Sequence, residues 1–142
     1  MGSIPWEGPR RSVEALARRH GRDAVVRRCV DLLAGREVEA EVIAALGGPP
    51  ARWVLDGGAA GPDYWLRVWA VRGLLWLWDD AALPSVLHAL GDPAWRVREM
   101  AAKVCARHQL DDALPRLLEL RDDPIARVRS AAGRAVIRLT TQ

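Results

Sequence analysis

The sequence contains no phenylalanine, one tyrosine and only two threonines among its 142 residues. Strands are typically rich in aromatic and β-branched residues and alternate apolar with polar side chains between turn signals. No stretch of this chain shows such alternation. We therefore predict an all-α fold.

Cysteine is also scarce. Cys29 and Cys105 are the two cysteines of the chain, and neither belongs to a CxxC motif or has a histidine at metal-ligand spacing. This argues against a disulfide framework and against a zinc site. Both fall on predicted apolar helix faces, so we interpret them as small core residues and predict no metal, no cofactor and a reducing cytoplasmic location.

Long apolar runs are absent. No segment approaches the roughly 20 apolar residues that a membrane-spanning helix needs. The first residues lack a basic region followed by an apolar one, and Trp6 stands where a myristoylation signal requires Ser or Thr. We expect a soluble protein without a membrane partner, forming one domain over residues 1–142.

Catalytic motifs are missing as well. The three histidines, His20, His88 and His108, lie far apart, and there is no HExxH, Gly-x-Ser-x-Gly or glycine-rich phosphate loop. Asp79 and Asp80 are paired carboxylates, but adjacent side chains point in different directions, and Asp80 is better placed as a helix N-cap. The sequence predicts a protein that is not an enzyme.

An internal repeat is present. The stretch Asp92–Arg98 (DPAWRVR) returns 31 residues later as Asp123–Arg129 (DPIARVR), and a weaker copy stands at Gly61–Arg67 (GPDYWLR). The same offset relates Ala82-Leu83-Pro84 to Ala113-Leu114-Pro115. A fixed period of this size indicates a repeat architecture.

Helical periodicity accompanies the repeat. Apolar residues recur at spacings of three and four, and Gly and Pro separate the segments. Residues 1–11 are expected to be irregular, and Ser12 is the expected N-cap of the first helix. The aspartates of Asp92-Pro93 and Asp123-Pro124 can cap the helices that follow. The Gly57–Gly61 loop is the expected mobile point. The predicted helices cover residues 13–20, 23–35, 38–46, 52–56, 62–78, 80–90, 93–107, 111–121 and 124–139.

The second helix of each pair carries one apolar stripe, as in Val128, Ala132, Ala135, Val136 and Leu139. A pair of helices cannot bury such a stripe by itself, so neighbouring pairs must stack. The Asp-Pro-x-x-x-Val-Arg pattern, with small residues after it and Leu-Pro-x-x-Leu before it, resembles HEAT repeats of the short kind found in bacterial proteins. The resemblance is clear over residues 62–142, implies a right-handed α-solenoid and extends to residues 12–60 as degenerate helices.

The resemblance also implies roles for charged residues. In HEAT repeats the Asp before the turn and the Arg after it form an intramolecular ladder, and Asp92 with Arg98 and Asp123 with Arg129 match those positions. Arg67 matches the Arg of the first unit, where Gly61 replaces the Asp and Asp63 could substitute. We interpret these residues as structural.

The opposite face of the second helices is basic. HEAT solenoids line their concave surface with second helices, so the resemblance implies a concave face rich in arginine. Rows of cations suit acidic protein segments or phosphate backbones, and indoles can anchor a partner or stack on bases. A solvated helix face, with tryptophans that only fill the core, would show the same pattern. The candidate binding residues are Trp65, Arg72, Trp76, Arg96, Lys103, Arg107, Arg127, Arg134 and Arg138.

Two functions compete for this face. The first is a non-catalytic scaffold that binds a protein partner. The alternative is nucleic-acid binding, distantly like the HEAT-like alkylpurine DNA glycosylases, although the chain is short for them and no Asp falls among the inner tryptophans. A resemblance to phycobilin lyases is weaker, because nothing indicates a tetrapyrrole site. A homo-oligomer through an uncapped C-terminal repeat is a further expectation.

Overall fold

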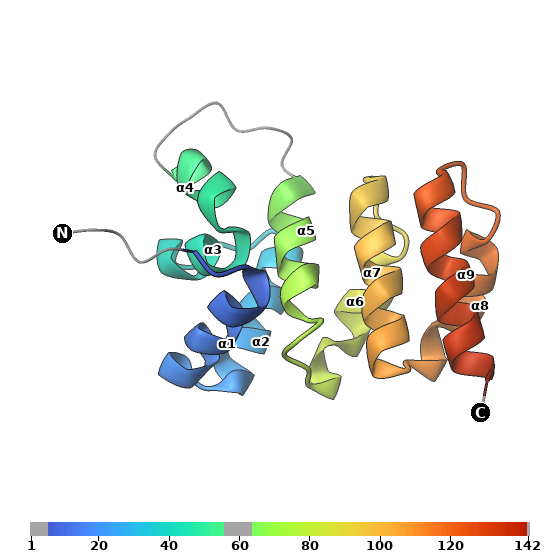
Figure 1. The fold of residues 1–142 in the computed structure, drawn as a ribbon, viewed down its shortest axis with the longest axis horizontal. Coiled ribbons are helices and arrows are strands. Elements are labelled where there is room, and N and C mark those ends of the chain that lie inside the picture. Colours follow the sequence, from blue (N-terminus) through green and yellow to red (C-terminus); the bar gives the residue numbers. More distant parts are fainter. Residues whose placement is uncertain (1–5, 56–63, 142) are drawn as a thin grey trace.

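The computed structural model describes residues 6–55 and 64–141, and every regular element in these ranges is helical (Figure 1). Short 3₁₀ turns, η1 (Asp80–Ala82) and η2 (Asp111–Ala113), lead directly into α6 and α8. The α-helices are α1 (Pro9–His20), α2 (Arg22–Leu33), α3 (Ala40–Gly47), α4 (Pro49–Leu55), α5 (Tyr64–Gly73), α6 (Leu83–Ala89), α7 (Trp95–His108), α8 (Leu114–Leu120) and α9 (Ala126–Thr140).

Helices α5, α7 and α9 stand side by side in one layer, and α6 and α8 lie behind them (Figure 1). The layers meet through the predicted apolar stripe. Val97, Ala101 and Cys105 of α7 are fully buried, as are Val128 and Ala132 of α9. Stacking of successive helix pairs therefore builds the core of an all-α solenoid.

The N-terminal helices pack differently from the later pairs. α1 packs on α2 and α3, and both α2 and α3 pack on α5. The contact is close at Gly73, where an added Cβ would lie 2.8 Å from Leu46 Cδ2 and 3.2 Å from Cys29 Sγ. The N-terminal helices thus cover a side of α5 that α7 and α9 do not cover.

The start of α1 differs from the prediction. The helix begins at Pro9, whose fixed φ suits the first helical turn, so residues 9–11 are helical rather than irregular. Ser12 is therefore not an N-cap. Its hydroxyl donates to the Ala45 carbonyl at 2.7 Å and fastens α1 to α3.

The structure corrects the N-cap roles predicted for Asp80, Asp92 and Asp123. Asp92 and Asp123 accept the N–H groups of Ala94 and Ile125 at 2.8 and 2.9 Å, so they close the turn that precedes α7 and α9. The helices consequently begin two residues beyond the prolines. In η1 the cap is Asp79, which accepts the N–H of Ala81, whereas Asp80 accepts the indole N–H of Trp78.

The helix predicted over residues 62–78 is also shorter than expected. It ends at Gly73, and the chain continues through turns in which Leu74 and Leu75 donate to the carbonyls three residues earlier. The predicted mobile loop at Gly57–Gly61 and the proposed substitute Asp63 lie outside the described residues.

Candidate interaction face

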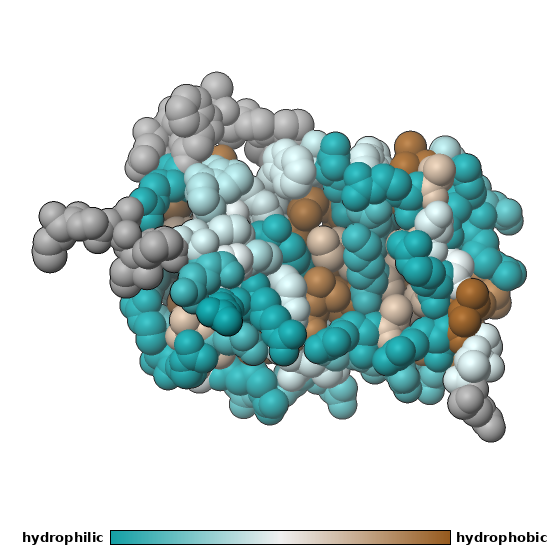
Figure 2. Space-filling model, in the orientation of Figure 1, coloured by the Kyte–Doolittle hydropathy of each residue, from teal (hydrophilic) through white to brown (hydrophobic). Residues whose placement is uncertain are grey.

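The surface of α5, α7 and α9 that is turned away from α6 and α8 is the predicted binding face, and all the predicted binding residues except Trp76 belong to these three helices. It faces the viewer in Figure 2, where hydrophilic residues predominate over α7 and α9. The structure separates these residues according to what their side chains contact.

The Asp/Arg ladder is the first feature beside this face. Arg67 donates from Nε and Nη2 to both carboxylate oxygens of Asp92 at 2.7 and 3.0 Å. Arg98 holds Asp123 in the same way, at 2.9 and 3.2 Å. Each rung therefore joins one repeat to the next. The expected pairing of Asp92 with Arg98 is corrected, because Arg98 contacts only the backbone carbonyl of Asp92.

Burial disfavours ionisation of Asp92 and Asp123. The hydrogen bonds from arginine and from the turn N–H groups outweigh that effect, and nearby guanidinium charges add to them, so the pKa of each carboxyl is lowered. Both groups are ionised at neutral pH. Their pairs with Arg67 and Arg98 are thus charge-assisted bidentate bonds, which are stronger than neutral ones.

Aromatic rings and guanidinium groups alternate along the first turns of α5, α7 and α9. The rings of Tyr64 and Trp65 lie 5.2 Å apart. The Arg96 guanidinium stands 5.3 Å from the Trp65 ring and 4.4 Å from the Trp95 ring. Arg127 lies 5.1 Å from Trp95 on its other flank. These cations and indoles are engaged with one another by cation–π attraction.

Trp95 was missed by the sequence analysis. It stands 31 residues after Tyr64, at the same place in the repeat, and that equivalence could have placed the two rings in one row.

A buried acid neutralises part of the basic face. Glu99 is only 7% exposed and accepts two hydrogen bonds from Arg127, at 2.8 and 3.0 Å. Lys103 stands 4.0 Å from the same carboxylate. The carboxylate of Glu99 therefore neutralises part of the charge of Arg127 and Lys103.

Arg72 of α5 lies against the N-terminal helix α3, and Trp76 follows the end of α5. Arg72 donates from Nη2 to the Leu46 carbonyl at 2.7 Å, and its buried Nε has no hydrogen-bond partner among the described residues. Burial lowers the pKa of this guanidinium. Trp76 is half-buried against the core. The Arg72 side chain accordingly links α5 to α3.

Three predicted arginines remain exposed. Arg107 lies in the last turn of α7, and Arg134 and Arg138 lie one turn apart on α9. No hydrogen bond or ion pair to these side chains occurs within residues 6–55 and 64–141. We call these three residues the free-cation patch.

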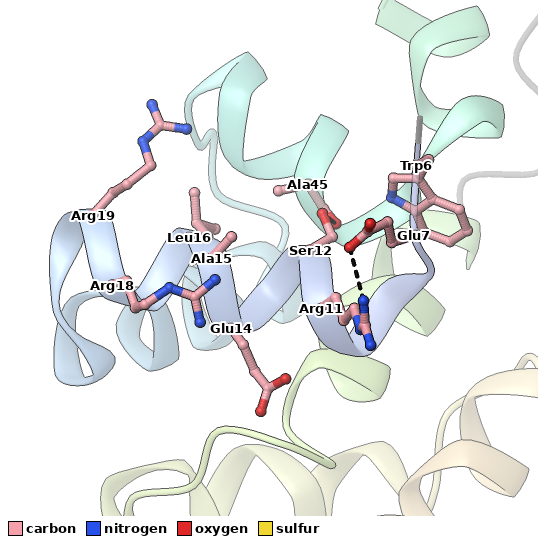
Figure 3. A pocket seen from close by; sticks show the side chains of 10 residues that line it. All are labelled: Trp6, Glu7, Arg11, Ser12, Glu14, Ala15, Leu16, Arg18, Arg19 and Ala45. Carbon is pink, nitrogen blue, oxygen red and sulfur yellow. Dashed lines mark hydrogen bonds and ion pairs between the residues drawn. The ribbon is translucent and has the colours of Figure 1, made fainter. Parts of the chain in front are cut away.

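The hollow in Figure 3 lies elsewhere, along α1 and beside α3. It has a volume of about 560 Å³ and is lined by residues that include Trp6, Arg11 and Leu16. Arg11 donates to Glu7 at 3.1 Å across its rim. None of the predicted binding residues lines this hollow.

The described residues include no group of three or more His, Cys, Asp or Glu side chains that could hold a metal. His108 lies 4.7 Å from Trp78 in a stack, and its Nε2 is 2.7 Å from the Leu74 carbonyl. Burial lowers its pKa, and the charge of Arg107 adds to this effect. The surroundings of His108 thus indicate a structural role for this side chain. No helix in this part of the chain could cross a membrane.

Stacked helix pairs with an inter-repeat Asp/Arg ladder define an all-α solenoid. The sequence model of HEAT repeats matches residues 51–137, which is more than half of the chain. The chain belongs to the HEAT repeat family, whose members often act as protein-interaction scaffolds and are generally non-catalytic. No curated protein and no solved structure matches it.

Proposed function

We propose that this HEAT-repeat chain is a non-catalytic scaffold that binds an acidic segment of a protein partner through the free-cation patch. The observation that carries the proposal is the lack of any carboxylate partner for Arg107, Arg134 and Arg138 within the described residues. Elsewhere on the same face, Arg127 and Lys103 already pair with the carboxylate of Glu99.

The geometry supports a carboxylate-rich ligand. Arg134 and Arg138 are four residues apart on α9, so their like charges repel each other, and α7 places Arg107 at the end of the neighbouring helix. An acidic segment lying across α7 and α9 would relieve this repulsion. Guanidinium groups also match carboxylates by bidentate hydrogen bonding.

Nucleic acid is the alternative ligand for three exposed arginines. Non-specific single-strand binding relies on aromatic faces on which bases stack. Here the indoles of Trp65 and Trp95 are faced by Arg96, and Trp95 also by Arg127. Because these rings are already engaged, the arrangement favours a protein partner over a base-stacking one.

The test is fluorescence anisotropy with a labelled glutamate–alanine peptide and with labelled duplex and single-stranded DNA, each at about 50 and 200 mM salt. We expect the peptide to bind, and we expect Arg107→Glu/Arg134→Glu/Arg138→Glu to weaken its affinity by tenfold or more, roughly. Circular dichroism checks that the variant is folded.

The matched control is Arg18→Glu/Arg27→Glu/Arg121→Glu, which makes the same change in net charge at exposed arginines outside the patch. Equal losses in the two variants would show unspecific charge attraction and overturn the proposal. Binding of DNA without binding of the peptide would replace the protein partner by nucleic acid. Absence of binding to every probe would remove the patch as a binding site.

A further inference from the structure

Arg96 and Arg127 occupy the same position in successive repeats, 31 residues apart, but within the described residues only Arg127 pairs with an acid. Arg127 of α9 donates two hydrogen bonds to Glu99 of α7, at 2.8 and 3.0 Å. The position equivalent to Glu99 on α5 is Val68, which is 6% exposed and so about as buried as Glu99. The repeat of Arg96 therefore has an apolar side chain where the next repeat has a carboxylate.

Aromatic rings hold the Arg96 guanidinium instead. It lies over the Trp65 ring at 5.3 Å and over the Trp95 ring at 4.4 Å from their centroids. Its N–H groups make no hydrogen bond or ion pair with a protein acceptor within residues 6–55 and 64–141. The donors of a guanidinium lie in its plane, so stacking on rings leaves them free to bind an oxyanion. Arg96 is thus an oriented cation without an acceptor in this part of the chain.

The surroundings of Arg96 suit a single carboxylate that stands beside an apolar side chain. Arg127 belongs to the same row of rings and guanidinium groups, but Glu99 neutralises part of its charge. The described residues therefore present one uncompensated positive charge at this position, which matches a carboxylate better than a phosphate group of nearly two negative charges. Tyr64 and Trp65 are half-buried, so they leave aromatic surface on which an apolar residue can pack.

We propose that Arg96, between the rings of Trp65 and Trp95, binds an aspartate or glutamate side chain of a partner protein, in a segment where an apolar residue stands next to the acid. The carboxylate accepts two hydrogen bonds from the guanidinium edge, and the apolar residue packs on the exposed part of the rings. Arg96 lies on α7, which has α5 on one side and α9 on the other (Figure 1). The site is therefore internal to the stack of described repeats.

This site is distinct from the free-cation patch. Arg96 lies in the first turn of α7 and Arg107 in its last turn, which separates them by roughly 16 Å along the helix axis. Binding at Arg96 does not depend on binding at the patch, so substitutions in the two places test the two proposals separately.

The probe is a short Ser/Gly peptide with a central Leu-Glu-Leu and blocked termini, compared with the same peptide carrying glutamine or phosphoserine in place of glutamate. Each is titrated into the full chain labelled with nitrogen-15, and the indole N–H signals are followed by NMR at about 150 mM salt. Trp65→Phe and Trp95→Phe assign the two signals beside Arg96. We expect the glutamate peptide to shift both signals saturably, with a dissociation constant of about 1 mM or lower. The glutamine peptide should bind about tenfold more weakly.

Two substitutions at Arg96 test its role. Arg96→Gln should abolish the saturable shifts. Arg96→Lys keeps the charge but loses the planar donor edge and the stacking, so we expect affinity to fall about tenfold. Circular dichroism and thermal unfolding check that both variants are folded.

Val68→Glu is an independent variant that leaves Arg96 in place. It puts an acid where Glu99 stands in the next repeat, at a similarly buried position. The new carboxylate should pair with Arg96 and occupy the site from within the chain, so the glutamate peptide should bind about tenfold more weakly. Combining Val68→Glu with Arg96→Gln should cost little more than either change alone.

Arg107→Glu/Arg134→Glu/Arg138→Glu is the control for the free-cation patch and should leave the shifts of the two indole signals unchanged. Four outcomes would overturn the proposal. These are no saturable shift of either signal up to about 5 mM peptide, equal binding of the glutamine peptide, binding that Arg96→Gln leaves intact, and loss of binding in the patch variant. Tighter binding of the phosphoserine peptide would make a phosphate group the ligand instead of a carboxylate.

Discussion

Arg98 holds the carboxylate of Asp123, 25 residues further along the chain, by two hydrogen bonds of 2.9 and 3.2 Å. The two side chains are largely buried, at 15% and 5% exposed. Because Arg98 lies on α7 and Asp123 in the turn before α9, this pair fixes the register of one repeat on the next. The same relation between Arg67 and Asp92 fixes α5 against α7.

Asp123→Asn tests the contribution of this rung to stability. The amide can still accept the N–H of Ile125, so the substitution removes mainly the charge. We expect the free energy of unfolding at pH 7 to fall by about 2 kcal/mol, because Arg98 loses its partner in a largely buried site. Urea unfolding followed by circular dichroism measures the change.

The effect should depend on pH. The pKa of Asp123 is lowered in the folded chain, so its stabilisation is present above the ordinary aspartate pKa of about 4 and is lost as the pH falls through the lower folded value. Wild type should therefore lose more stability than Asp123→Asn on acidification below pH ~4. The neighbouring Asp122 is exposed, and Asp122→Asn is the control. An equal loss in both variants would contradict a specific rung.

Two glycines should respond to alanine in opposite directions. In α9 a Cβ at Gly133 would meet nothing within 4 Å, so Gly133→Ala should raise the free energy of unfolding by about 0.5–1 kcal/mol through helix propensity. A Cβ at Gly47 would lie 2.6 Å from both Ala51 Cβ and the Trp69 ring. Gly47→Ala should therefore destabilise by about 1–3 kcal/mol. Denaturant melts of the two variants compare them directly, and a stabilising Gly47→Ala would show that α4 can move away.

The two thiols should be unreactive in the folded protein. Cys29 and Cys105 are fully buried, and burial raises the pKa of each thiol to about 12. A thiol reagent at pH ~8 should modify neither until guanidinium unfolds the chain, because the thiolate is the reacting form. Ser130→Cys, at an exposed position of α9, is the control and should react at once. Rapid labelling of wild type would mean that the core opens readily.

Glu99→Gln should strengthen the binding of an acidic peptide. Glu99 accepts both hydrogen bonds of Arg127 and lies near Lys103. Removing its charge leaves those two cations available to a ligand, so we expect affinity to rise by a few-fold, roughly, at low salt even though the protein becomes less stable. Anisotropy with the glutamate–alanine peptide measures this, and weaker binding would indicate that Glu99 holds the face in its binding shape.

The sequence by itself determined the repeat, the all-α class and the apolar stripe of each second helix. These follow from local periodicity, because residues three and four apart share a helix face wherever the helix lies. Cys29 and Cys105 were placed in the core for the same reason. The sequence also indicated which arginines recur in the repeats, but not which of them have a partner within the protein.

Only the tertiary structure decided the partners of those arginines. Arg98 contacts a residue 25 positions away, Arg127 takes a glutamate from the preceding helix, and Arg72 is covered by α3. Such contacts depend on how helices stack, and the N-terminal helices, which do not follow the 31-residue period, could not be placed by it. Periodicity describes one helix at a time, whereas the charge left free for a ligand is what remains after neighbouring helices have paired the rest.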